Sequence, residues 1–525
     1  MKENKSKLFK QRLFRIHAAV GILVSSFMYI SIFFGVFTIF LPYIKTWEKP
    51  SRYIEDINIM NIDYNSMINE VLKNPDFPKD DILINLPGNM GDPAVVITHR
   101  FAKEQVFNPK TNEKINNETK EQTGLADFIN HLHYGRPLKS IGMIFFGFIA
   151  TATLALILTG LILIIKMKFK NKGKNQQSIF SKVHVKIFSW IFFPLILITL
   201  SGALMNVGLI SAGPMSQIIT KGEAKSIDAV VGTVLFAQNK ASKKANKPAK
   251  MKDIKNLLIK AQEINPQLIF KQIKLVNWND KNAQVEIIGY NPYKPFFNGG
   301  IFNKPTIILS AVNADLIKNQ KVMDKVWTVF VAEIIFFLHF LFGIDIFSRV
   351  LIAVLMILSA IAIGFGTMLF LEKKAKKFDD KITFYHWIGK FSLASMIGII
   401  PSIAMLFVLQ WMLPFDLEDR LIWQQGIFYN IWLFTLFWSF YKINSYEVAK
   451  NFFFIGGLLF IISVMLHLIF LNIPILEFFN LSSIFTVDIS LVLLGIILIY
   501  ISEKLPKNRD EAKLFWTLKK QKDNK

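Results

Sequence analysis

Apolar residues occur along this chain in long blocks, eight of which are about twenty residues or longer. A helix of that length crosses the roughly 30 Å hydrocarbon core of a bilayer, and a helix satisfies its own backbone hydrogen bonds there. The pattern therefore predicts a polytopic α-helical membrane protein with about eight transmembrane helices. We expect the spans at about residues 17–44, 141–165, 187–209, 348–371, 386–412, 423–441, 451–471 and 483–502.

Two long polar stretches separate the early spans, and both have the same predicted order of a short helix followed by strands. The first has a helix over 65–72 and strands over 82–86, 94–99 and 105–108. The second has a helix over 253–264 and strands over 272–278, 284–290 and 306–311. Turns are expected at 108–112 and 313–314. The shared order indicates two extracytoplasmic α/β inserts of one type, and a duplicated span–insert–span unit.

Composition agrees with a membrane location, since 52% of the residues are apolar and only 19% are charged. The first block has a basic flank like that of a signal peptide. It is too long for one and lacks a small-residue cleavage site, so we expect it to remain as an anchor.

Lysine and arginine collect on one side of the predicted path, where short basic loops stay cytoplasmic. They number six, seven, five and eight in residues 1–15, 166–186, 372–381 and 503–525. We therefore expect both termini in the cytoplasm and both inserts outside. Topology and anionic lipid account for the net charge of +23, so no nucleic-acid partner is expected.

The predicted organisation has a cytoplasmic tail with the first span, an insert, spans two and three, a second insert, the fourth span, four further spans and a basic tail. These segments cover residues 1–44, 45–127, 128–209, 210–325, 326–371, 372–502 and 503–525.

Four histidines occupy matched positions at the edges of the spans. His17 and His184 open spans on the cytoplasmic side, and each is followed eighteen residues later by a glycine. His133 and His339 each follow a leucine and precede spans on the outer side. Neutral imidazole is a good axial ligand for haem iron, and a helix bundle holds such cofactors between facing side chains. We therefore predict two haems, one on His17 with His184 and one on His133 with His339.

The chain contains no cysteine, which excludes Cys-ligated iron–sulfur clusters and covalent c-type haem. Non-covalent haem b is the predicted cofactor. Zinc fits poorly, because no closely spaced histidine pair comes with an acidic partner.

Three further histidines compete for the same role. His131 lies two residues before His133, His386 opens the fifth span, and His467 lies late in the seventh. An ionisable residue inside a membrane is a candidate functional residue. A lone histidine at a membrane edge is nevertheless more often an interfacial or hydrogen-bonded side chain, and that alternative stays open.

Cations beside the cytoplasmic histidines suit haem propionates. Arg15, Lys182 and Lys186 are the candidates, although positive-inside sorting explains them equally well. On the outer side, the candidate contacts for a bulky iron chelate are Trp47, Tyr134, Arg136 and Asp345.

The order of spans, inserts and histidines resembles the PepSY-associated transmembrane proteins, over roughly residues 10–375. The matching residues are Arg15 and His17 with Gly21, Leu132 with His133, Lys182 with His184, Leu338 with His339, and the strand-turn run 105–113. Two departures are Phe188, where the first unit has glycine, and Asn112, where the family usually has a turn glycine.

The resemblance implies a bacterial inner-membrane protein tied to iron uptake, similar to ferric-siderophore reductases that carry two haems. Its partner would be a ferric siderophore or another iron chelate. No dinucleotide-binding G-x-G-x-x-G follows a predicted strand, so electrons would come from a separate cytoplasmic reductase or from quinol.

Two other functions stay open. The chain could be a transporter for an iron chelate or a metal, which predicts no visible chromophore. It could also be a PepSY-type membrane regulator of a peptidase, but that function leaves the four matched histidines unexplained.

Overall fold

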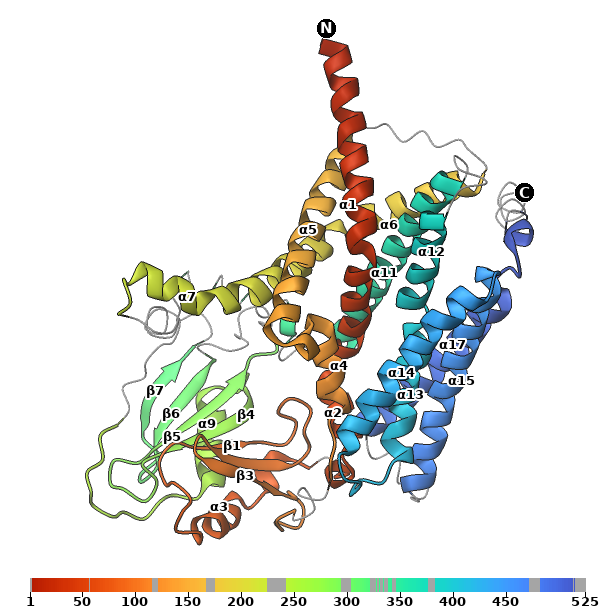
Figure 1. Ribbon diagram of the computed structural model, residues 1–525. Helices are drawn as coiled ribbons and strands as arrows, with labels where there is room; N and C mark the ends of the chain where they lie inside the picture. Colours follow the sequence, from red (N-terminus) through yellow and green to blue (C-terminus); the bar gives the residue numbers. More distant parts are fainter. Residues whose placement is uncertain are drawn as a thin grey trace.

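The computed structural model describes residues 2–55, 57–115, 121–166, 175–223, 242–293, 304–321, 339–341, 346–375, 383–471 and 482–512, with the single residues 327, 330, 334 and 514. Their helices form two groups that lie side by side; one antiparallel sheet lies below the first group and beside the lower part of the second in the view of Figure 1. The first helix begins and the last transmembrane helix ends toward the opposite end.

The first group consists of α1 (Lys2–Ile39), α5 (Lys139–Lys166), α6 (Gln176–Ala203) and α11 (Ile346–Ala375). Helix α1 packs against α5 and α11, and α6 packs against the same two helices. It follows that α1 stands diagonally opposite α6, and α5 diagonally opposite α11. Apolar side chains such as Ile157, Ile191 and Met356 fill much of the space between them.

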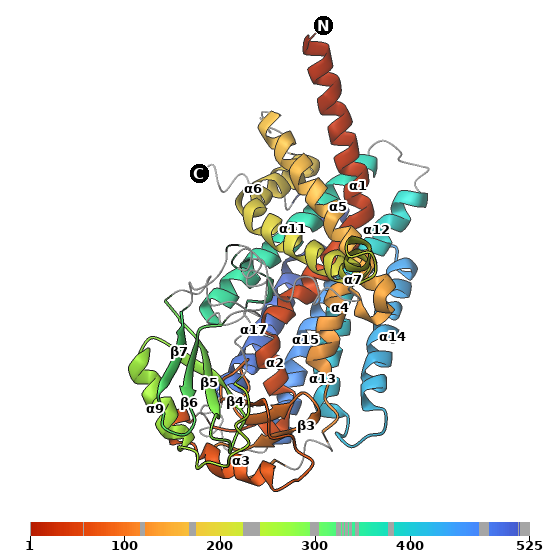
Figure 2. The same cartoon turned by 90° about the vertical axis from the view of Figure 1, so that its left-hand side faces the viewer.

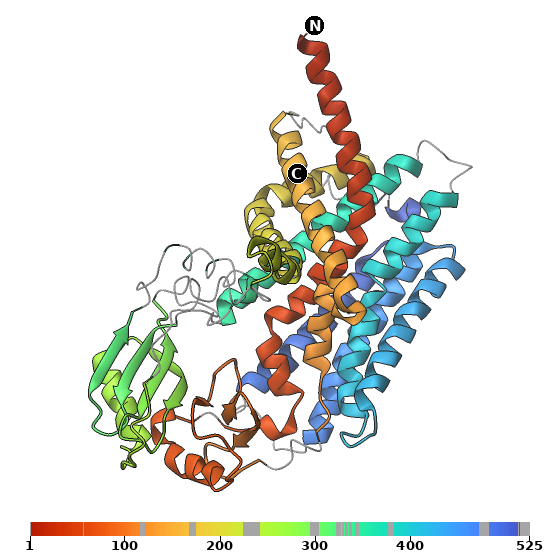
Figure 3. The same cartoon turned by 60° about the vertical axis from the view of Figure 1, so that its left-hand side comes forward.

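The second group contains α12 (Thr383–Met396), α13 (Ile399–Met412), α14 (Arg420–Tyr441), α15 (Ser445–Leu471) and α17 (Ser482–Lys504). Figure 3 shows these helices beside the first group. Helix α13 is the most enclosed, because α14 and α15 pack on it from two directions. Its buried face includes Ile403, Phe407 and Trp411.

Small residues bring α15 and α17 close together. A Cβ atom added at Gly457 would lie 2.6 Å from the carbonyl oxygen of Gly495, and one added at Gly495 would lie 2.7 Å from the carbonyl oxygen of Gly457. Helices in membranes associate through close contacts of this kind, since lipid offers no hydrophobic driving force.

Seven helices among the described residues are long and apolar enough to cross a membrane. They cover Ser6–Ile39, Arg136–Lys166, Gln176–Gly208, Ile346–Lys374, His386–Met412, Ser445–Leu471 and Ile484–Lys504. The expected sixth span, at 423–441, corresponds to α14, which is helical but is not among the seven. The expected number of eight is therefore not confirmed.

The strands form one seven-stranded antiparallel sheet in the order β3-β2-β1-β4-β5-β6-β7. Its members are β1 (Ile82–Asn85), β2 (Val95–His99), β3 (Ala102–Phe107), β4 (Ile269–Val276), β5 (Gln284–Tyr290), β6 (Thr306–Ser310) and β7 (Leu316–Gln320). Strand β1 pairs with β4 from Ile82↔Leu275 to Asn85↔Gln272. The strands of the two inserts, expected as two separate units, are thus joined. An unpaired edge strand exposes backbone donors and acceptors, and each insert satisfies the edge of the other.

Helices α3 (Tyr64–Leu72) and α9 (Ile254–Ile264) cover one face of the sheet (Figure 2). Both begin at an aspartate cap: the Asp63 carboxylate accepts from the Ser66 amide at 3.0 Å, and the Asp253 carboxylate from the Lys255 amide at 2.7 Å. The turn after β3 has Asn112 at a φ of 60°. Asparagine tolerates this left-handed conformation, which explains how it replaces the expected glycine.

Short elements connect the sheet to the helices. Helix α4 (Leu125–Tyr134) packs between α1 and α13, and α2 (Leu41–Trp47) packs against α4 and α17. Gly135, at a φ of 80°, ends α4 with a left-handed cap. The remaining short elements are α7 (Leu209–Ile219), the 3₁₀ turns Pro50–Arg52, Ile59–Asn61 and Arg136–Leu138, and the π-helical turn Leu204–Gly208.

Candidate functional site

The side chains of four histidines lie against helices of the first group. His17 lies on α1 and His184 on α6, while His133 ends α4 just before α5 and His339 lies just before α11. Since α1 is diagonal to α6 and α5 is diagonal to α11, the four side chains form two facing pairs. The structure brings together His17 with His184, and His133 with His339, as the sequence predicts.

The imidazole centroids of His133 and His339 are 6.0 Å apart, and their planes are inclined by 34°. Two metal–imidazole bonds of about 2 Å, with about 1 Å more from each nitrogen to its ring centre, separate the centroids by about 6 Å when one ion lies between them. The centroid spacing therefore fits two axial ligands of one iron.

Each of the four rings lies against a glycine of a neighbouring helix. A Cβ atom at these glycines would lie only 3.0 to 3.3 Å from the histidine Cε1 atom. The pairs are His17 with Gly160, His184 with Gly366, His133 with Gly35, and His339 with Gly202. A side chain at these positions would press on the ring, which would have to shift by a few tenths of an ångström to admit even a Cβ atom.

The glycine contacts repeat with the same spacing in both halves of the chain. Gly35 and Gly202 follow His17 and His184 by eighteen residues, and Gly160 and Gly366 follow His133 and His339 by twenty-seven. The second spacing is a sequence signal that was missed. Because His133 packs on Gly35, the two histidine pairs are separated along α1 by eighteen residues, or about 27 Å.

Two of the rings donate to backbone carbonyl groups. The Nδ1 atom of His133 lies 2.7 Å from the carbonyl oxygen of Ser31, and the Nδ1 atom of His184 lies 2.7 Å from that of Ala362. A carbonyl oxygen only accepts hydrogen bonds, so the hydrogen of the neutral ring is on Nδ1. The Nε2 atom of each ring then carries the free lone pair.

The other two rings bind hydroxyl groups, with the same result. Nδ1 of His17 lies 3.0 Å from Oγ1 of Thr159, and Nδ1 of His339 lies 3.0 Å from Oγ of Ser201. Each hydroxyl donates its own hydrogen to a carbonyl group of its helix, so its oxygen accepts from Nδ1. Metal-ligating histidines are oriented in this way, with one nitrogen bound to the protein and the other directed at the metal.

The backbone at His339 is fixed from a second helix. Arg349 of α11 donates to the carbonyl oxygen of Leu341 at 2.9 Å and also to that of Ile39 at the end of α1. The contact ties the segment that carries His339 to two helices of the first group.

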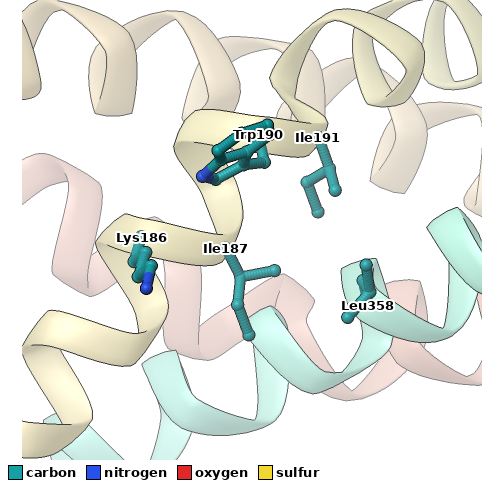
Figure 4. Close-up of a pocket in the computed structure, with 5 residues that line it drawn as sticks. All are labelled: Lys186, Ile187, Trp190, Ile191 and Leu358. Carbon is teal, nitrogen blue, oxygen red and sulfur yellow. The ribbon is translucent and has the colours of Figure 1, made fainter.

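An apolar cavity of about 390 Å³ opens between α6 and α11, one to two turns beyond His184 (Figure 4). Ile187, Trp190 and Ile191 line it from α6, and Leu358 lines it from α11, with Lys186 at one end. The four histidines also keep partly exposed surfaces although they point between helices. Apolar space therefore lies near His184, within two turns along α6.

The candidate propionate contacts are all exposed. Arg15 precedes His17 by two residues, and Lys182 and Lys186 flank His184. Their position beside the His17–His184 pair is compatible with contacts to haem propionates. It is equally compatible with the excess of basic residues on the cytoplasmic side of membrane proteins.

The other candidate histidines lie elsewhere. His131 is half-buried and meets Tyr134 edge-on at 5.9 Å, and His386 is exposed at the start of the fifth span. His467 is fully buried in the second helix group, where both of its ring nitrogens have protein partners. Trp47, expected at an outer chelate site, is fully buried beside it.

The donor set favours a macrocycle over a bare ion. Across the described ranges, no three histidine, aspartate or glutamate side chains converge well enough to hold a metal ion. Two imidazoles supply only axial positions, and a porphyrin supplies the rest of the iron coordination itself. The paired rings, the apolar space and the nearby cations therefore fit haem b.

Comparison with known protein families identifies a family that the chain matches. The model of the PepSY-associated TM region matches residues 14–373, which include both histidine pairs and all four glycines. No curated protein matches the chain.

Proposed function

This chain belongs to the PepSY-associated TM family, and on that premise we propose that it is a haem-containing membrane electron-transfer protein that reduces a ferric chelate. The observation that carries the proposal is the common state of the four histidines. Each ring is anchored through Nδ1, keeps Nε2 for a metal, and faces a second such ring across the helix group.

Two haems b would be held, one by His17 with His184 and one by His133 with His339. Bound haem supplies one-electron redox chemistry. The residues of the chain fix the ring orientation through Thr159, Ser31, Ala362 and Ser201, and the apolar helices keep water from the site. A separation of about 27 Å between the layers would place them near opposite faces of a bilayer of about 30 Å.

The basic segments support a bacterial inner-membrane orientation with both termini in the cytoplasm. The sheet and the His133–His339 pair would then lie at the outer face, where a ferric siderophore would receive an electron. Hard oxygen ligands hold Fe(II) less tightly than Fe(III), so reduction would release the iron. The donor would be a cytoplasmic reductase or membrane quinol, because electrons must enter at the His17–His184 layer.

An optical spectrum of the purified protein tests the cofactor. We expect a Soret band, sharp α-bands after dithionite reduction, and about two haems per chain. His133→Ala and His184→Ala should each remove one haem, whereas His131→Ala should retain both. A colourless protein from cells supplied with haem overturns the proposal.

Substrate specificity needs a separate measurement. Protein in sealed vesicles, reduced from inside, should convert an external ferric siderophore to Fe(II) that a ferrous chelator captures. His339→Ala should abolish this conversion. If a protein with both haems leaves the ferric chelate unchanged, the reductase assignment fails while the haem assignment stands.

A further inference from the structure

A second buried histidine site lies outside the haem region, between α15 and α17. His467 is 0% exposed and Asp488 is 3% exposed. The Nδ1 atom of His467 lies 2.8 Å from one carboxylate oxygen of Asp488 and 3.0 Å from the other. An unpaired charge at this depth would be costly, so the two groups depend on each other.

The start of the first insert adds two more partners. The Trp47 indole donates to the Asp488 carboxylate at 2.8 Å, and the Tyr53 hydroxyl lies 2.7 Å from Nε2 of His467. Trp411 of α13 stacks on the imidazole, with centroids 4.2 Å apart and planes inclined by 26°. Three segments that are distant from α15 in sequence therefore converge on one imidazole.

The hydrogen-bond partners permit two protonation states. Nδ1 also lies 3.1 Å from the Trp47 indole nitrogen, but the indole hydrogen has a shorter contact with Asp488, at 2.8 Å. Nδ1 therefore donates its hydrogen to the carboxylate, which only accepts. The Tyr53 oxygen lies 2.8 Å from the carbonyl oxygen of Trp47 and 2.7 Å from Nε2 of His467, but it has one hydrogen to donate. If that hydrogen goes to the carbonyl group, Nε2 donates to Tyr53 and His467 is an imidazolium. If it goes to Nε2, His467 is neutral.

The two states differ by one proton and a hydroxyl rotation, and no heavy atom has to move. A purely structural ion pair would need only one of them. Tyr53 is also the one half-exposed member of the group, so it connects the buried pair to the solution on the side of the sheet.

Among the described residues, helix α17 presents the titratable group Asp488 to the site, whereas α13 and α2 present the neutral indoles of Trp411 and Trp47. Glu121, which accepts from the Ser51 amide at 3.1 Å, acts on Tyr53, and burial raises the pKa of Tyr53 well above its ordinary value. Tyr53 therefore stays protonated and relays a proton without becoming an anion.

We propose that His467, Asp488 and Tyr53 form a proton-binding site that exchanges its proton with the solution on the side of the sheet. In the loading step, the Tyr53 O–H bond breaks as its proton passes to Nε2, and the Tyr53 oxygen takes a proton from a hydronium ion of the solution, which leaves as water. The product is an imidazolium paired with the Asp488 carboxylate, and release reverses the step. Chains of histidine, acidic and hydroxyl side chains inside membranes serve proton relays in this way.

Nitrogen NMR of full-length protein with isotope-labelled histidine, in lipid nanodiscs, tests the site. The His467 signals are assigned by their loss in His467→Gln. We expect them to change together between imidazolium and neutral positions as the pH of the buffer is varied. Signals that keep one protonation state throughout overturn the proposal.

Two variants separate the roles of the partners. Asp488→Asn should remove the imidazolium state, and Tyr53→Phe should slow exchange of the His467 proton with water at least tenfold while leaving the fold intact. An unchanged exchange rate in Tyr53→Phe overturns the proposed route, even if His467→Gln fails to fold. His131→Asn is the matched control and should alter only its own signal. The result does not depend on haem content.

Discussion

His184 lies directly against Gly366, so that a Cβ atom at residue 366 would be 3.1 Å from both Cε1 and Nδ1 of the imidazole ring. The same helix accepts the hydrogen of this ring at the carbonyl oxygen of Ala362, one turn earlier. Helix α11 therefore provides both the space for the ring and the partner that orients it.

Gly366→Val should displace the His184 ring and, if the proposed function holds, remove the haem that we propose for the His17–His184 pair. The reason is steric, because the added carbons occupy the position of the imidazole. Haem content per chain measures the effect, and we expect it to fall from two to one. Gly364→Val is the matched control on the same helix, since a Cβ atom there meets nothing within 4 Å. Equal haem loss in both variants would contradict the steric explanation.

Thr159→Val should leave the His17 ring less firmly oriented, so that the proposed haem would bind more weakly but would still bind. The valine keeps the shape of the side chain but has no oxygen to accept the Nδ1 hydrogen, and loss of such an orienting partner typically weakens metal binding by about 10- to 100-fold. Haem titration and the midpoint potential measure the change. Thr159→Ser should restore both. Thr153→Val, whose hydroxyl bonds only within its own helix, should match the parent protein.

Glu48 should make stability depend on pH. Burial raises its pKa from 4.5 to about 7, against the opposing effect of the Ala126 amide that donates to it. The folded chain keeps this proton up to about pH 7, whereas the unfolded chain releases it near 4.5, so stability falls as pH rises between these values. The loss amounts to about 3 kcal/mol.

Thermal unfolding in detergent across this pH range measures the effect of Glu48. Glu48→Gln keeps an acceptor for the Ala126 amide but cannot ionise. The melting temperature of this variant should therefore lack the decline that the parent protein shows. Parallel pH curves for the two proteins would show that other groups control the stability.

Gly457→Val should destabilise the second helix group by about 1–3 kcal/mol through overpacking. The added side chain meets the backbone of α17 at Gly495, which cannot move aside as a flexible side chain can. Gly426→Val on α14 is the control, because that position is open. The midpoint of denaturant unfolding compares the two variants, and similar midpoints would rule out the close approach of α15 and α17.

Regular patterns in the chain were sufficient to locate many elements. The pattern of apolar and polar residues predicted β5 with its observed bounds, Gln284–Tyr290. It also predicted both ends of α9 to within one residue. Strand β7 (Leu316–Gln320) was missed because most of its side chains are exposed, which leaves no alternation to detect. The pairs of matched histidines could be predicted for a similar reason, since duplication preserved their spacing.

Features that depend on distant contacts could not be predicted. The pairing of β1 with β4 joins backbone groups that no local pattern identifies. His467 was recognised as an unusual residue, but its partners come from residues 47, 53, 411 and 488, and only the assembled helices reveal them. Trp47 was wrongly expected at an exposed outer site for the same reason. Nothing in the local sequence shows whether an aromatic residue near a membrane edge is buried.

The β1–β4 ladder has a mechanical consequence for the two halves of the chain. In an alternating-access transporter, the two halves of the protein must move relative to each other. Here four consecutive residue pairs, from Ile82↔Leu275 to Asn85↔Gln272, connect the two halves outside the helices. This strand pairing opposes relative motion of the two halves and keeps the distance between the two histidine pairs constant. A fixed spacing suits the passage of electrons, whose rate depends on distance, and it is unfavourable for the passage of a bulky solute.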